Sequence, residues 1–313
     1  MPVNPALQMI LDGAAQAALA APPPTDPEAR LAMLRAGVET FSVLGGGEPE
    51  PMHAVDDLFC DGPHGAIPIR RYLPTSDAGL PVVLFFHGGG FVCGNVGCYD
   101  LLVRRIAAET GAAVFSVEYR LAPEHPFPIP LDDCYAALAW VVQNAEDLGV
   151  DGTRVAVAGD SAGGNLSAAL ALRARVDGPP LRAQVLIYPV IDPACDTRSM
   201  DDNAAGYLLT ADAMREMWSF YLRGCDNPED TLLAVNKAAD LSGLPPALII
   251  TAEFDPLRDE GEHYAELLDD FDVETKLIRY DGMIHGFLGM RDILPESNQA
   301  VTEIATFLKA RLA

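Results

Sequence analysis

The sequence is short of basic residues and lacks any long apolar run. It has 21 Lys and Arg against 45 Asp and Glu, which gives a formal net charge of −24 at pH 7. So acidic a surface repels phosphate backbones and anionic headgroups, which disfavours nucleic acid and membranes as partners. No uncharged apolar stretch approaches the roughly 20 residues of a membrane-spanning helix. The first residues also lack the basic start of a secretory signal.

Cysteine pairs and metal-binding motifs are missing as well. The six cysteines are spread through 313 residues without a Cys-x-x-Cys motif. This spacing disfavours a disulfide scaffold and favours reduced thiols in a cytoplasmic protein. Neither His-Glu-x-x-His nor a phosphate-binding glycine motif occurs. We therefore expect no metal, nucleotide or other cofactor.

What the sequence does contain is an alternation of strand and helix patterns. The expected strands are residues 66–73, 81–86, 112–117, 154–158, 184–188, 247–251 and 275–279. The expected helices between and after them are residues 100–110, 131–147, 162–176, 258–270 and 296–312. Several strands are continuous apolar runs, as in sheets that helices cover on both faces. The alternation predicts an α/β fold with a mostly parallel central sheet.

Two segments fall outside this alternation. Helices are expected at 5–20 and 27–44, ended by Pro22-Pro23-Pro24 and by Gly45-Gly46-Gly47. Residues 190–241 show no convincing strand but contain a helical pattern at 211–222. We expect these parts to pack together as a lid. The predicted organisation is N-terminal cap helices (1–47), a core in two parts (48–189 and 242–313) and a cap insertion (190–241).

The motif Gly159-Asp160-Ser161-Ala162-Gly163 follows the expected strand 154–158 and opens the next helix. Gly-x-Ser-x-Gly in this context forms a sharp turn that exposes a serine hydroxyl above the sheet. The glycines relieve crowding at the turn, and the N-terminus of the helix favours negative charge beside the serine. Ser161 is therefore the predicted nucleophile.

A second glycine motif, His87-Gly88-Gly89-Gly90, follows the buried strand 81–86. Glycines let backbone amides approach a substrate closely. We expect the amides of Gly89, Gly90 and Ala162 to stabilise the oxyanion of a tetrahedral intermediate.

A base and an acid complete the predicted site. His285 follows the last expected strand, and Asp255 follows the strand 247–251. Ligands of parallel sheets bind at these carboxyl ends of strands. Asp259, Glu260 and Glu253 are rivals to Asp255, although the first two suit the start of a helix. The order Ser, Asp, His is that of the α/β-hydrolases.

With these motifs the sequence resembles the hormone-sensitive-lipase-like family of α/β-hydrolases, which includes bacterial carboxylesterases. The resemblance covers about residues 80–290 and also includes Tyr119–Glu124, Gly164-Asn165, Pro256–Gly261 and Gly286-Phe287. It implies that Ser161, Asp255 and His285 form the triad, that Gly89, Gly90 and Ala162 form the oxyanion hole, and that a helical cap covers the site. The segment 91–100 departs from the pattern of many relatives, which leaves the substrate pocket less defined.

The resulting hypothesis is a serine carboxylesterase that acts on short- to medium-chain esters of small molecules. The residues expected at the substrate are Phe91, Tyr188, Leu208, Met214 and Ile284. An amidase or a lipase on the same fold, or a ligand receptor that has lost catalysis, are the alternatives. A homodimer is the expected assembly only because symmetric dimers are common.

Overall fold

An eight-stranded sheet crosses the part of the chain that the computed structural model describes, residues 2–20, 23–44 and 47–313. The strand order is β1-β2-β4-β3-β5-β6-β7-β8. Strands β4, β3, β5, β6, β7 and β8 pair in parallel, whereas β2 pairs antiparallel with β1 and β4. The strands are β1 Ala54–Gly62, β2 Gly65–Leu73, β3 Leu80–Phe86, β4 Ala113–Val117, β5 Val150–Asp160, β6 Ala183–Ile187, β7 Ala247–Phe254 and β8 Thr275–Ile284.

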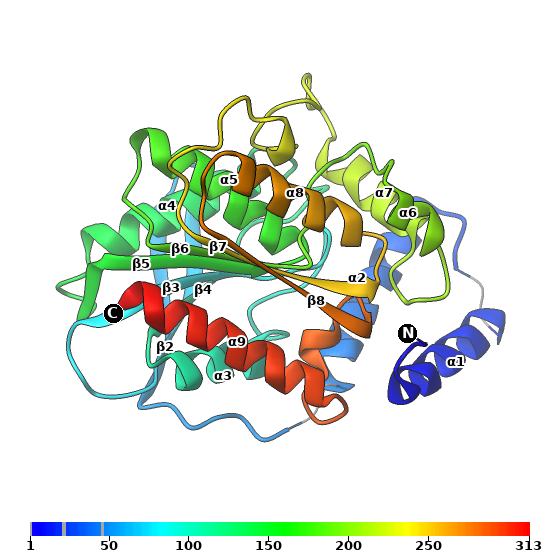
Figure 1. Cartoon of the computed structure of the whole chain (residues 1–313), viewed down its shortest axis with the longest axis horizontal. Coiled ribbons are helices and arrows are strands. Elements are labelled where there is room, and N and C mark those ends of the chain that lie inside the picture. Colours follow the sequence, from blue (N-terminus) through cyan, green and yellow to red (C-terminus); the bar gives the residue numbers. More distant parts are fainter. Residues whose placement is uncertain (1, 21–22, 45–46) are drawn as a thin grey trace.

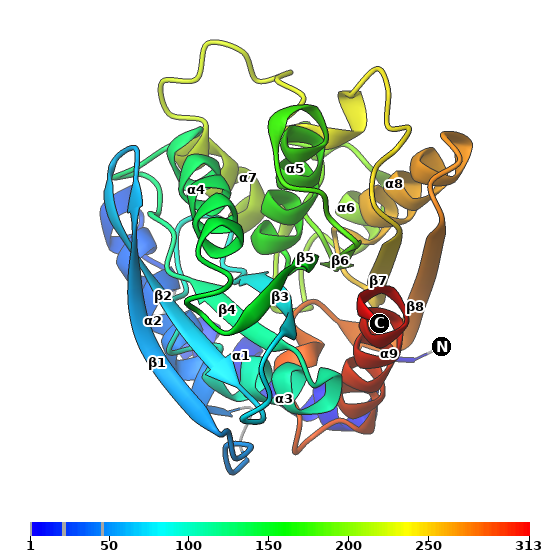
Figure 2. The same ribbon diagram turned by 90° about the vertical axis from the view of Figure 1, so that its left-hand side faces the viewer.

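Helices cover both faces of this sheet. Helices α4, α5 and α8 lie on one face, and α3 and α9 lie on the other (Figures 1 and 2). The helices are α1 Pro5–Ala20, α2 Pro27–Leu44, α3 Asp100–Thr110, α4 Ile129–Gln143, α5 Ala162–Asp177, α6 Arg198–Asp202, α7 Ala211–Tyr221, α8 Arg258–Asp270 and α9 Pro295–Leu312, with short 3₁₀ turns at Val235–Lys237 (η1) and Phe287–Gly289 (η2). The predicted mostly parallel sheet with flanking helices is thus confirmed.

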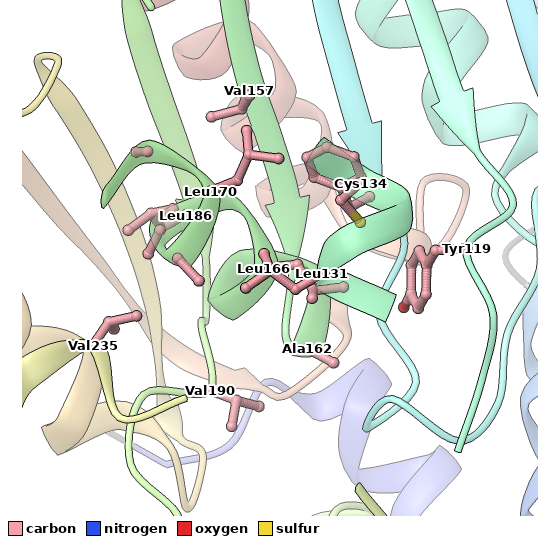
Figure 3. Packing of buried hydrophobic residues seen from close by; sticks show 14 of the residues in the cluster. Tyr119, Leu131, Cys134, Val157, Ala162, Leu166, Leu170, Leu186, Val190 and Val235 are labelled. Carbon is pink, nitrogen blue, oxygen red and sulfur yellow. The ribbon is translucent and has the colours of Figure 1, made fainter. Parts of the chain in front are cut away.

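The core is divided by the sheet into two apolar layers. On one face Leu166 and Leu170 of α5 pack with Val157 of β5 and Leu186 of β6 (Figure 3). On the other face, buried side chains of α3 and α9 such as Ile106 and Ile304 meet the opposite faces of the same strands. Because both faces are buried, the central strands need apolar residues at nearly every position.

Strand β1 is missing from the predicted elements, because its sequence has no clear apolar alternation. It is an edge strand that pairs with β2, and most of its side chains are partly or fully exposed. Polar cross-strand pairs hold it instead: Asp56 lies opposite Arg71 and Asp57 opposite Arg70, with N–O distances of 2.6 and 2.7 Å.

The predicted end of the fourth helix is also wrong by four residues. Helix α4 ends at Gln143 instead of residue 147. The side-chain amide of Asn144 donates to the carbonyl of Trp140 at 2.8 Å and occupies an acceptor at the helix terminus. The short helix α6 was not predicted either.

Four helices, α1, α2, α6 and α7, lie beyond the carboxyl ends of the parallel strands (Figure 1). An ion pair of 2.6 Å between Arg30 of α2 and Glu216 of α7 joins segments far apart in the sequence. Pro22, Gly45 and Gly46, expected to end α1 and α2, lie outside the described residues. None of the helices in the described part of the chain is long and apolar enough to cross a membrane.

Candidate active site

Ser161 occupies a strained turn between β5 and α5. Its φ of 55° and ψ of −118° are unusual for a residue with a side chain. A Cβ on Gly159 would lie 2.2 Å from the carbonyl oxygen of Gly163, and one on Gly163 would lie 1.9 Å from that of Phe86. Both positions therefore exclude larger residues, and the turn presents the serine hydroxyl at the sheet edge.

Two further strand ends bring His285 and Asp255 to this serine. The hydroxyl oxygen of Ser161 lies 3.0 Å from Nε2 of His285. Nδ1 of the same ring lies 2.7 Å from Oδ2 of Asp255, a residue with no solvent exposure. These distances fit a neutral imidazole that donates from Nδ1 to the carboxylate and accepts from the serine at Nε2.

The rival carboxylates point to other partners. Oδ2 of Asp259 accepts the backbone N–H of Ser199 at 2.8 Å, and Oε1 of Glu260 accepts that of Ile191 at 2.8 Å. A carboxylate oxygen of Glu253 accepts the N–H of Gly282 at 2.7 Å. Of the four acidic residues, Asp255 is the one whose carboxylate is hydrogen-bonded to His285.

The glycine motif after β3 forms a tight loop beside the serine. Gly89 and Gly90 have φ values of 116° and 60°, a region that glycine adopts without strain. A Cβ on Gly89 would lie 2.1 Å from the carbonyl oxygen of Cys93, whose own N–H bonds back to the carbonyl of Gly89. No hydrogen bond within the described residues uses the amides of Gly89, Gly90 or Ala162. These amides are available to a ligand.

The ring of His87 is buried beside the glycine loop that follows β3. Burial lowers the pKa of its ring to about 4, so the ring is neutral near pH 7. It stacks on Tyr119 with 4.3 Å between ring centroids, and the hydroxyl of Tyr119 donates to the carbonyl of His87 at 2.6 Å. His87 is therefore part of the loop's packing, and His285 is the histidine placed to accept a proton from Ser161.

A cavity of about 690 Å³ opens over the serine. Ser161, His285, Gly89 and Gly90 lie in its wall, which is largely apolar. Among the predicted substrate contacts, Tyr188, Leu208 and Met214 line this cavity. The ring of Tyr188 also packs against that of His285, with 4.6 Å between centroids.

Phe91 and Ile284, by contrast, are not in the cavity wall and have no exposed surface. The ring of Phe91 stacks on Tyr221 of α7 at 3.9 Å, so it anchors the helix instead of facing the cavity. The wall also contains residues that were not among the predicted substrate contacts, three of them in the unusual segment 91–100. They come from α1, α2, α3, α7 and the segment after the glycine loop: Ala14, Ala17, Met33, Leu34, Val38, Cys93, Cys98, Tyr99, Leu101, Leu102 and Met217.

Glu260, beside the site, carries a buried carboxyl group whose ionisation opposes folding. Burial raises its pKa well above the ordinary value of 4.5, and the neighbouring Asp192 and Asp255 act in the same direction. Above about pH 4.5 the unfolded chain loses this proton while the folded protein keeps it. The contribution of Glu260 to stability is therefore present below this pH and is lost as the pH rises through the folded-state pKa.

Replacing Glu260 by Gln is expected to remove this loss while keeping an oxygen for the N–H of Ile191. Between pH 5 and pH 8 the free energy of unfolding should fall less steeply than in the wild type, by up to about 1.4 kcal/mol per pH unit, the limit for one proton. Urea unfolding at several pH values measures this slope. Glu266→Gln, an exposed change on the same helix, should keep the wild-type slope. Equal slopes for Glu260→Gln and wild type would contradict the assignment.

Among the residues that the structure describes, no group of three or more His, Cys, Asp and Glu side chains is placed to hold a metal ion. At the cavity wall, Ser161 and His285 are hydrogen-bonded to each other, and the ring of His285 is hydrogen-bonded to Asp255 behind it. A hydroxyl, an imidazole and a carboxylate in series, next to unused amides, constitute an arrangement suited to acyl transfer.

The chain is similar in sequence and in fold to known hydrolases. A family model for the alpha/beta hydrolase fold matches residues 83–289, a range that contains Ser161, Asp255 and His285. Carboxylesterase NlhH from Mycobacterium tuberculosis is 45% identical over 251 residues, which cover 79% of each chain. The ethyl acetate hydrolase of Pseudomonas putida is 36% identical over 284 residues, 88% of each chain. The structure of a hyperthermophilic esterase from the archaeon Pyrobaculum calidifontis is 41% identical, matches 100% of both chains and has a TM-score of 0.89.

Proposed function

The chain belongs to the α/β-hydrolase fold family, among the carboxylesterases related to hormone-sensitive lipase, and we propose that Ser161, His285 and Asp255 are its catalytic triad. The protein is a carboxylic ester hydrolase. The observation that supports the triad most directly is the hydrogen-bonded series from Ser161 Oγ through the His285 ring to Asp255, at distances of 3.0 and 2.7 Å.

Catalysis begins when His285 Nε2 accepts the hydroxyl proton of Ser161 as its oxygen attacks the ester carbonyl. Asp255 stabilises the imidazolium ion that forms. The amides of Gly89, Gly90 and Ala162 donate to the oxyanion of the tetrahedral intermediate, and each such donor is typically worth about 10²–10³-fold in rate. The imidazolium then gives its proton to the leaving alcohol, which leaves an acyl-enzyme on Ser161.

Water completes the cycle. His285 accepts a proton from the water as it attacks the acyl-enzyme, the same amides stabilise the second oxyanion, and the proton returns to Ser161 as the acid departs. Every step uses groups that the chain supplies.

The cap proposed at 1–47 and 190–241 determines which esters enter. Residues of α1, α2 and α7 line the cavity, and the Arg30–Glu216 pair joins the N-terminal part to the insertion. A largely apolar cavity of about 690 Å³ holds a small ester and a short or medium acyl chain. We propose such esters as substrates. We also propose a cytoplasmic location, because the six cysteines are free, as is usual in that reducing compartment. A homodimer is the proposed assembly.

We expect p-nitrophenyl acetate, butyrate and hexanoate to be hydrolysed at least about tenfold faster than the palmitate, because a cavity of about 690 Å³ has the size of sites that bind small-molecule ligands. Initial rates at matched soluble concentrations measure this series. The corresponding p-nitroanilides and emulsified triglycerides test the amidase and lipase alternatives, and faster turnover of either would overturn the carboxylesterase assignment.

Covalent labelling of Ser161 by an organophosphonate, detected by peptide mass spectrometry, tests the nucleophile. A folded protein that fails to label would favour a receptor that has lost catalysis.

A further inference from the structure

The carboxylate of Asp160 lies between the two glycine motifs. Asp160 is the last residue of β5 and directly precedes Ser161. Its Oδ1 accepts the backbone N–H of Gly88 at 2.8 Å, and its Oδ2 accepts the hydroxyl of Tyr99 at 3.0 Å. One side chain on the strand of the nucleophile thus binds both the start of the glycine loop and the residue before α3.

The loop is packed tightly against this carboxylate. A Cβ on Gly88 would lie 2.5 Å from Oδ2 of Asp160, and one on Gly94 would lie 2.7 Å from the carbonyl oxygen of Gly88. Tyr99 belongs to the segment whose sequence departs from that of many relatives, and its ring and the Asp160 side chain both line the cavity. The position of Gly88, and with it that of Gly89 and Gly90, is therefore linked to the Asp160 side chain.

Keeping this carboxylate buried is unfavourable. Asp160 is 4% exposed, and burial raises the pKa of its carboxyl group to about 6. The titratable groups that face it are the phenols of Tyr99, Tyr119 and Tyr188, from the segment before α3 and from the ends of β4 and β6, and the ring of His285 after β8. The nearby ring of His87 after β3 is neutral near pH 7. None of these forms a close ion pair with Asp160 within the described residues.

We propose that Asp160 is a positioning residue for ester hydrolysis: its Oδ1 anchors Gly88 so that the amides of Gly89 and Gly90 face the oxyanion formed at Ser161. This inference rests on the proposed function. Donors stabilise an oxyanion when they lie about 2.7–3.1 Å from it, and a displacement of about 1 Å reduces the rate about 10²-fold. The bond from Gly88 to Asp160 joins the loop to the residue next to Ser161, so it ties the position of the amides to that of the serine.

Three variants separate the contacts of Asp160. Asp160→Ala removes both acceptors and is expected to lower kcat about 10²–10³-fold with little change in KM, as loss of an oxyanion donor does. Asp160→Asn keeps an oxygen for the N–H of Gly88 and should recover kcat to within about tenfold of the wild type. Tyr99→Phe leaves the Gly88 bond in place and should lose less than about tenfold.

The decisive measurement compares ground-state and oxyanion binding. A trifluoromethyl ketone forms a hemiketal with Ser161: the serine oxygen bonds to the carbonyl carbon, its proton passes to His285 Nε2, and the carbonyl oxygen becomes an oxyanion. Its inhibition constant should rise in Asp160→Ala by about the same factor as kcat/KM falls, whereas the inhibition constant of the carboxylate product should stay within about threefold. Rates are expressed per active site, counted by organophosphonate labelling, so that misfolded protein does not contribute.

Asp133 provides a control away from the cavity, with the difference that its carboxylate also pairs with the Arg120 guanidinium at 2.6 Å. It is a buried carboxylate that also accepts a backbone N–H, that of Arg120 at 3.1 Å, but it lies outside the cavity wall. Asp133→Asn should leave kcat per active site and ketone affinity unchanged. The positioning role is overturned if Asp160→Ala turns over within about threefold of the wild type, if it weakens product and ketone binding equally, or if Asp160→Asn is as impaired as Asp160→Ala. A Ser161→Ala enzyme with normal turnover would instead overturn the proposed function.

Discussion

Replacement of Ser161 by alanine is expected to lower kcat on p-nitrophenyl butyrate by about 10⁴- to 10⁶-fold, the range for loss of a nucleophile in serine hydrolases. The variant lacks the oxygen that attacks the carbonyl, and His285 Nε2 then has no hydroxyl to deprotonate. Stability and product affinity should change little, because the substitution removes a single hydroxyl from an otherwise intact cavity wall. Steady-state kinetics, urea unfolding and an inhibition constant for the product measure these quantities.

Ser167 gives a control on the same helix. Its hydroxyl is buried and donates to the carbonyl of Gly163 at 2.8 Å, so Ser167→Ala removes a hydroxyl of α5 without touching the nucleophile. This variant should keep kcat within a few-fold of the wild type. Retention of more than about a hundredth of the wild-type rate by pure Ser161→Ala would exclude Ser161 as the nucleophile.

Replacement of Asp255 by asparagine is expected to lower kcat about 10⁴-fold, as in other serine triads. The backbone N–H of Leu257 donates to Oδ1 of Asp255 at 2.9 Å, which fixes the asparagine amide with its NH₂ group toward His285. Nδ1 of the ring must then accept a hydrogen bond, so the ring proton moves to Nε2. In that tautomer Nε2 cannot accept the proton of Ser161.

The rival acid provides the control for this prediction. Asp259→Asn keeps an acceptor for the N–H of Ser199 and does not touch the histidine, so its kcat should remain within a few-fold of the wild type. The two variants are compared at several pH values, with active sites titrated first. A larger loss in Asp259→Asn than in Asp255→Asn would reverse the assignment of the acid.

The prediction of the fold succeeded where burial dictates the sequence. Strands β3, β6 and β7 are apolar at nearly every position because helices cover both faces, and their expected bounds lie close to those found. Strand β1 was missed because most of its side chains are at least partly exposed and ion pairs to β2 replace apolar contacts. Apolar residues recur at the positions that are buried, so an exposed edge strand such as β1 has only a weak apolar pattern.

The sequence already favoured Asp255 as the acid, but the contacts that distinguish it from its rivals, and the composition of the pocket, come from the three-dimensional arrangement. Asp255 and Asp259 both follow β7 within a few residues, and only the turn at Leu257 directs the first toward His285 and leaves the second for Ser199. The cavity wall combines residues from the N-terminal helices and from the segment after β8. The Met214 side chain faces the cavity, whereas the Phe91 ring points away from it and packs against Tyr221 of α7. The spacing of residues along the sequence does not predict which of these two side chains faces the cavity.

The two glycine motifs, the serine between β5 and α5 and the histidine after β8 follow from the sequence alone, because sharp turns and close backbone approach permit few residue types. The tertiary structure decided how these parts meet. It placed the carboxylate of Asp160 between the motifs and brought α1, α2 and α7 over the serine. Such contacts join residues tens to hundreds of positions apart, and their geometry depends on how the whole sheet packs its helices.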